Sequence, residues 1–200
     1  MVKEQAAPQH WPLPLLGPYL ERRAMDLLPG PSMHMGMELG RRGDAHRLSA
    51  AMLDGLASIT RHPDGRPLAD KGYGLSHAYT GGLMLAVTGR RPLGCDLETV
   101  APRTRDIWHD LLGATRLALA EQVGSALDED LDTAATRVWT AMESMKKAGL
   151  PTSAPITIDP THHDGWLILR SGTFAIAGTV LAVQSSERHV AIAIATELQA

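Results

Sequence analysis

The chain has 200 residues, of which 44% are hydrophobic, and carries a formal net charge of −3 at pH 7. This length suits one domain or two small halves packed together, and the charge excludes a general attraction to nucleic acid or to anionic membranes. The single cysteine excludes an internal disulfide and fits a reducing cytoplasm. Because no apolar run reaches the roughly 18 residues of a membrane span, we expect a cytoplasmic protein without a membrane segment.

The N-terminal region is rich in proline, at positions 8, 12, 14 and 18, and lacks the apolar core of a secretory signal. Residues 1–18 are therefore predicted to form an extension or linker. A short helix is expected over residues 19–28, because the Pro-Gly-Pro sequence that follows ends a helix.

The next segment joins a strand to a helix through a basic turn. Met alternates with other residues over 33–37, which indicates a strand, and Asp44 is a good N-cap for the helix after it. Arg41, Arg42 and Arg47 surround the start of this helix. A helix N-terminus beside arginines favours a phosphate ligand, although a solvated basic turn is the simpler alternative.

Residues 92–98 contain a pair of carboxylates on a predicted strand. Strand alternation puts Gly94, Asp96 and Glu98 on one face and three apolar side chains on the other. Two carboxylates so spaced lie roughly 7 Å apart and repel each other, which a hard divalent cation such as Mg²⁺ relieves. The alternative is a strand end with exposed carboxylates. Residues 83–88 are expected to pair with this strand as a hairpin.

The second half continues with helices and then strands. Residues 106–112 and 115–127 are helical patterns separated at Gly113, and a third helix starts from a cap at Asp132 or Thr133 and ends at Gly149. Extended segments follow over residues 156–158, 166–169, 174–183 and 190–196. Residues 82–87 and 189–194 each close one half of the chain with a strand of small and aliphatic residues. This echo is weak, but it suggests an α+β fold of two similar halves with a boundary near Arg91.

The third helix presents Trp139, Glu143 and Lys147 on one face, because they are four residues apart. An ordinary Glu143–Lys147 pair worth a few tenths of a kcal/mol would also explain this spacing.

Together these motifs resemble the 4′-phosphopantetheinyl transferases of the larger, Sfp-like class. That family has a Gly-x-Asp-x-Glu strand followed by a Trp-x-x-x-Glu-Ser-x-x-Lys helix, which here are residues 94–98 and 139–147. Upstream motifs match in the same order, at Asp44-Ala45-His46-Arg47, Gly65-Arg66-Pro67 and Ser76-His77. The resemblance covers roughly residues 41–150. A narrower resemblance is to the carboxy-terminal transferase domain of enediyne-type iterative polyketide synthases, which serve antibiotic biosynthesis.

The resemblance implies a holo-[acyl-carrier-protein] synthase, a Mg²⁺-dependent enzyme. Such enzymes move 4′-phosphopantetheine from coenzyme A to a serine of an acyl carrier protein and release adenosine 3′,5′-bisphosphate. The resemblance also implies an α+β fold of two similar α/β halves, packed about an internal pseudo-twofold axis. Residues 92–200 would form the metal and catalytic side, and residues 19–91 the nucleotide-binding side. The expected partners are coenzyme A and the acyl carrier protein, which belongs either to the same polypeptide or to another, and the expected state is a monomer.

By the same resemblance, Asp96 and Glu98 hold Mg²⁺. Glu121 is the candidate for a third ligand, although Arg116 also falls near the family's position. Glu143 is the implied general base, and Lys147 neutralises a phosphate oxygen.

The nucleotide contacts are implied for the first half of the chain. Arg47 and His77 would hold the 3′-phosphate, Arg66 would lie near the adenine and Ser76 near the phosphates. Arg41 or Arg42 would add positive charge.

Three features depart from the family pattern. Ala78 replaces a frequent Ser, Met142 replaces a frequent Lys, and the segment leading to Glu121 has Leu111-Leu112-Gly113 in place of the usual aromatic pair. They leave two alternatives open. One is a non-catalytic module of the same fold that docks carrier proteins, and the other is a Mg²⁺-dependent phosphohydrolase.

Overall fold

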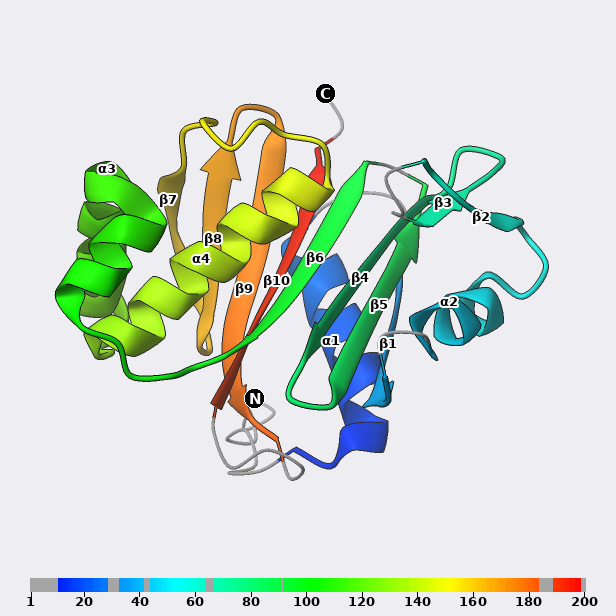
Figure 1. Ribbon diagram of the computed structural model, residues 1–200, viewed down its shortest axis with the longest axis horizontal. Helices are drawn as coiled ribbons and strands as arrows, with labels where there is room; N and C mark the ends of the chain where they lie inside the picture. The colour runs from blue at the N-terminus through cyan, green and yellow to red at the C-terminus, as the bar shows by residue number, and fades with distance from the viewer. Residues whose placement is uncertain are drawn as a thin grey trace, which may run out of the picture.

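The structure, a computed structural model, describes residues 11–28, 33–41, 44–63, 67–90, 92–183 and 189–198, with the backbone alone at 161–163. A three-stranded and a five-stranded antiparallel sheet lie beside each other, with helices packed against both (Figure 1). The fold is therefore α+β, as the sequence predicted.

The smaller sheet has the strand order β1–β5–β4. Its strands are β1 (Met33–Leu39), β4 (Gly74–Thr80) and β5 (Leu83–Gly89). Gly81 and Gly82 close the β4–β5 hairpin with φ angles of 53° and 83°, a two-residue turn that needs positive φ at both positions. Outside this sheet lie α2 (Ala45–Leu53) and a ribbon of β2 (Ile59–Arg61) and β3 (Pro67–Ala69).

The larger sheet has the strand order β6–β10–β9–β8–β7. The strands are β6 (Leu93–Thr99), β7 (Thr157–His163), β8 (Trp166–Ser171), β9 (Phe174–Ala182) and β10 (His189–Glu197). The hairpin predicted between residues 83–88 and 93–98 is wrong, because β6 pairs with β10 from the end of the chain. A partner so distant in sequence leaves no signal in the local pattern.

Helix α1 (Leu13–Leu27) starts before the predicted position 19. Pro14 lies in its first turn, where the missing N–H costs no helical hydrogen bond, and Leu16 is fully buried. Trp11 also bridges to the second half, at Val183. Residues 11–18 are therefore part of the fold rather than a linker, and the rest of the predicted extension, 1–10, lies outside the described residues.

Two apolar cores hold the fold together. Helix α1 fills one core together with the inner faces of both sheets. The other lies between the outer face of the larger sheet and helices α3 (Arg105–Leu127) and α4 (Leu131–Lys147). Gly113 kinks α3 with φ 72°, as its position predicted, and the Asp130 carboxylate caps α4. No helix in the described ranges is both long and apolar enough to span a membrane.

Strands β4 and β6 lie side by side where the two sheets meet, although they belong to different sheets (Figure 1). Hydrogen bonds that involve side-chain hydroxyls cross this boundary. The Ser76 hydroxyl accepts a hydrogen bond from the Cys95 amide at 2.9 Å, and the hydroxyls of Thr80 and Thr99 are 3.1 Å apart. The strands of the smaller sheet all precede residue 91 and those of the larger sheet all follow it.

Candidate functional site

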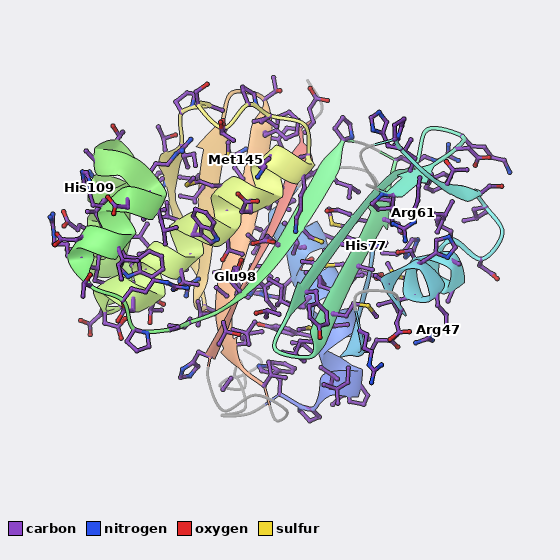
Figure 2. The ribbon with its side chains drawn as sticks, viewed as in Figure 1. Arg47, Arg61, His77, Glu98, His109 and Met145 are labelled. Carbon is purple, nitrogen blue, oxygen red and sulfur yellow. The ribbon has the colours of Figure 1, made fainter. Side chains whose placement is uncertain are left out.

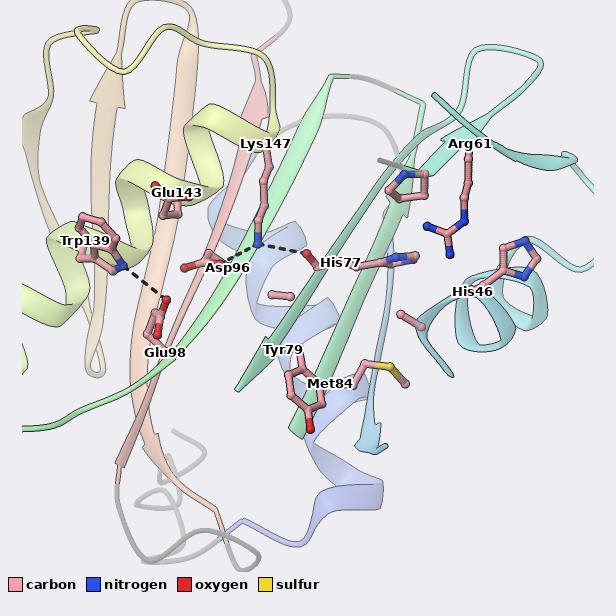
Figure 3. Close-up of a pocket in the computed structure, with 13 residues that line it drawn as sticks. His46, Arg61, His77, Tyr79, Met84, Asp96, Glu98, Trp139, Glu143 and Lys147 are labelled. Atoms are coloured by element: carbon pink, nitrogen blue, oxygen red, sulfur yellow. Dashed lines mark hydrogen bonds and ion pairs between the residues drawn. The ribbon is translucent and has the colours of Figure 1, made fainter. Parts of the chain in front are cut away.

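A cavity of about 780 Å³ opens at the boundary between the two sheets (Figure 3). On one side lies what we call the acidic wall: Asp96 and Glu98 on β6, and Glu143 on α4. Opposite lies the basic wall: His46 on α2, Arg61 on β2 and His77 on β4. Both halves of the chain thus contribute to one cavity with opposite charge on its two sides.

The acidic wall depends on close contact between α4 and β6. Asp96 and Glu98 face the cavity from β6, while Leu93, Cys95 and Leu97 face the core with α1. This alternation confirms the sequence prediction. A side chain at Gly94 would overlap the backbone of Ser144 and Ala148 in α4. Glycine therefore allows the helix to lie directly on the strand, which brings the two motifs together.

Asp96 is the most buried carboxylate of the acidic wall, at 6% exposure. Its Oδ1 accepts a hydrogen bond from Lys147 Nζ at 2.7 Å, and the same ammonium donates to the backbone oxygen of His77 at 3.1 Å. Its Oδ2 is buried and has no hydrogen-bond partner within the described part of the chain. Burial raises the pKa of Asp96, although Lys147 partly opposes this shift.

Glu98 and Glu143 complete the acidic wall. Trp139 Nε1 donates a 3.4 Å hydrogen bond to Glu98 Oε1 (Figure 3). Burial and then the charge of Asp96 raise the pKa of Glu98. Glu143 forms an ion pair with Lys146 at 3.3 Å and contributes to the raised pKa of Asp96. Asp96 is therefore close enough to both glutamates for their charges to interact with its own.

These groups fit a magnesium ion. The donors are hard carboxylate oxygens, and Asp96 Oδ2 is a buried acceptor that lacks a partner. Among the described residues, no three His, Cys, Asp or Glu side chains form a complete metal-binding cluster. Magnesium is commonly held by one or two carboxylates and completed by water and substrate phosphates, so Asp96 and Glu98 are a sufficient protein contribution.

His77 is the central residue of the basic wall. Its ring lies against α2, where Nε2 makes a short hydrogen bond with the Ser49 hydroxyl. Burial lowers the pKa of His77 to about 4, and the nearby charges of His46, Arg61 and Lys147 add to this shift. The ring is therefore neutral at pH 7.

Ser76 and Arg66, the next two nucleotide contacts expected from the sequence, are not among the described residues that line the cavity. Ser76 lies on the opposite face of β4 from His77, because side chains alternate along a strand, and its hydroxyl bonds to Cys95 across the sheet boundary. Arg66 lies outside the described residues, and so does Arg42.

Arg47 and Arg41, two further arginines expected to contact the nucleotide, are both exposed. Arg47 is 69% exposed and pairs with Glu38 at 2.5 Å; Figure 2 shows it apart from Arg61 and His77. Arg41 is exposed, and its backbone amide bonds to Asp44. Neither side chain lines the cavity.

Glu121 is also separate from the acidic wall. It lies on α3, 45% exposed, and its carboxylate accepts hydrogen bonds from Arg105 at 2.7 and 3.2 Å. Arg116, the other residue near that family position, donates to the backbone oxygens of Thr152 and Ala154. Neither residue lines the cavity, so neither has geometric support as a third ligand.

Sequence reasoning missed His46 and Arg61, which line the cavity in place of Arg47. His46 precedes Arg47 directly, and a step of one residue turns a side chain by about 100° around a helix. Arg61 lies in a three-residue strand beside a turn, where no periodic pattern indicates direction.

No protein-family model matches the chain, and no match was found among curated proteins. The motifs and the cavity are therefore the grounds for assigning a function.

Proposed function

We propose that this protein is a Mg²⁺-dependent 4′-phosphopantetheinyl transferase that moves 4′-phosphopantetheine from coenzyme A to a serine of an acyl carrier protein. One observation carries the proposal: two motifs more than forty residues apart meet in one cavity. Asp96 and Glu98 come from the first motif, and Glu143 and Lys147 from the second. A basic wall faces them across the cavity.

The charge distribution supports a pyrophosphate substrate. Transfer of a phosphoryl group needs its negative charge to be neutralised and its leaving group to be held. Asp96 and Glu98 would hold Mg²⁺, which neutralises charge on the pyrophosphate when it is bound. Arg61 and His46 supply positive potential opposite, which suits the phosphates of the leaving nucleotide.

The reaction would form a bond from the serine oxygen to phosphorus and break the pyrophosphate P–O bond. Adenosine 3′,5′-bisphosphate leaves with the bridging oxygen. Glu143 is the candidate to accept the serine proton, because its carboxylate lines the cavity and is bonded only to the exposed Lys146 among the described residues. Lys147 is the candidate cation for a phosphate oxygen.

The proposal includes the family's architecture of two similar halves about a pseudo-twofold axis, acting as a cytoplasmic monomer. The division of the strands at residue 91 between two sheets supports the two halves of this architecture. The narrower resemblance suggests a polyketide-synthase carrier protein as the partner.

The test is the intact mass of such a carrier protein after incubation with this protein, coenzyme A and Mg²⁺. We expect a gain of one phosphopantetheine group that EDTA prevents and that Asp96→Asn does not produce. Binding of coenzyme A with no mass gain would favour the docking module instead. Nucleotide release without any carrier protein would favour the phosphohydrolase.

A further inference from the structure

Ser49 is a buried side chain that contacts the cavity-lining His77 and for which the sequence motifs give no role. It lies on α2, three residues after His46, and is 0% exposed. Its hydroxyl contacts Nε2 of His77, which comes from β4. Figure 3 shows the His77 ring extending towards α2, with Arg61 and His46 nearby.

We propose that Ser49 is a positioning residue for the basic wall: its hydroxyl donates to Nε2 of His77 and so keeps the ring hydrogen on Nδ1, as an uncharged donor to a phosphate oxygen. The inference rests on the proposed function in one respect only, namely that the ligand of the cavity contains a phosphate group. The arrangement of Ser49 and His77 is a property of the protein alone.

The direction of the hydrogen bond follows from the number of protons available. A serine hydroxyl has one proton to donate, and within the described residues His77 is its only hydrogen-bond partner. If the ring donated instead, the buried Ser49 proton would have no acceptor there, at a cost of about 1–3 kcal/mol. Donation from Ser49 to Nε2 avoids that cost and leaves the ring hydrogen on Nδ1.

The surroundings keep the ring uncharged. His77 is mostly buried, and His46, Arg61 and Lys147 all disfavour a further positive charge on it. A neutral imidazole has one donor and one acceptor nitrogen. Since Nε2 is the acceptor for Ser49, Nδ1 remains the donor, and it has no hydrogen-bond partner among the described residues.

The basic wall thus combines two kinds of group. Arg61 and His46 provide positive potential, and His77 provides a fixed N–H direction. A phosphate oxygen is recognised by such a donor without a second buried charge. If Ser49 only filled space on α2, alanine could replace it without any effect on His77. The proposal expects an effect on His77, so this substitution tests it.

The first measurement is the ring tautomer of His77, from long-range ¹H–¹⁵N spectra of the full chain at pH 7 without ligand. We expect the Nδ1–H form in the wild type and a shift towards Nε2–H in Ser49→Ala. Ser171→Ala is the matched control, because it removes another buried serine hydroxyl, in β8, and should leave the His77 signals unchanged. A wild-type ring in the Nε2–H form would overturn the proposal even if Ser49→Ala failed to fold.

The second measurement is the affinity for inorganic phosphate. Ser49→Ala should bind it about tenfold more weakly, and adding Ser49→Ala to His77→Ala should cause no further loss, because the two residues act as a unit. An unchanged affinity in Ser49→Ala would overturn the donor role. If affinity depends on Ser49 while carrier proteins gain no mass, this inference stands and the proposed transferase function falls.

Discussion

The two walls of the cavity differ in how they are built. The acidic wall is formed by one strand and one helix that are in direct contact at Gly94. Its three carboxylates belong to two short sequence motifs. The basic wall takes one side chain from each of three elements, α2, β2 and β4, that are joined by turns. Regular elements in contact therefore preserve a motif's geometry, whereas turns between short elements decide which of several basic residues reaches the site.

The largest expected effect tests the acidic wall. Asp96→Asn keeps the shape of the side chain but removes the charge that would hold a cation. We expect the kcat/KM of transfer to fall by about a thousandfold, because metal-ion catalysis supplies several kcal/mol. Transfer assays with circular dichroism as the folding control measure this. Activity close to that of the wild type would mean that the acidic wall is not the metal site.

The next effect concerns His77 and pH. Its folded-state pKa of about 4 lies below the ordinary 6.5, so between these values the unfolded chain binds more protons. Stability due to His77 therefore falls as pH drops from 6.5 to about 4 and is unaffected above 6.5. Relative to His77→Gln, the wild type should lose up to about 3 kcal/mol between pH 7 and pH 4.

Urea unfolding of both proteins at several pH values measures this loss. The difference between them cancels contributions that they share, including those of Asp96 and Glu98, whose raised pKa values act in the opposite direction. A difference that does not vary with pH would show that the His77 ring is not shielded from solvent.

A smaller effect separates two arginines of the first half. Arg61→Ala should raise the KM for coenzyme A by about tenfold, because Arg61 lines the cavity. Arg47→Ala should change it by less than about twofold, since its exposed pair with Glu38 contributes little. The reverse result would show that the basic wall rearranges when the ligand binds and that Arg47 is the contact.

The smallest effect is expected at Glu121. Glu121→Gln removes an exposed ion pair with Arg105, so stability should change by no more than about 0.5 kcal/mol. The Mg²⁺ concentration needed for half-maximal transfer should stay within about twofold of the wild-type value. A tenfold increase would restore Glu121 as the third metal ligand.

Local patterns predicted much of the second half of the fold. The kink at Gly113, the helix that carries Trp139 and the alternation around Asp96 all follow from periodicity and glycine, which act over a few residues. The same rule of alternation, applied to β4, would have separated Ser76 from His77, since successive side chains on a strand point to opposite faces of the sheet.

The remaining features depend on tertiary contacts. The N-terminal prolines indicated a linker, but Pro14 fits the first turn of α1, and Pro18 is tolerated inside that helix because the helix fills the core between both sheets. Strand β6 pairs with β10 rather than with its neighbour in sequence. The Ser49–His77 contact joins two elements through one side chain each, and no sequence periodicity predicts such a pairing.

Lys147 connects the chemistry of the cavity to the separation of the two sheets. Its ammonium bonds at once to the Asp96 carboxylate of one sheet and to a backbone oxygen of the other, where β4 and β6 share no backbone ladder. An anion that draws Lys147 towards itself therefore removes one hydrogen-bonded link between the sheets. The width of the cavity and the charge of its ligand are thereby coupled through a single flexible side chain, that of Lys147.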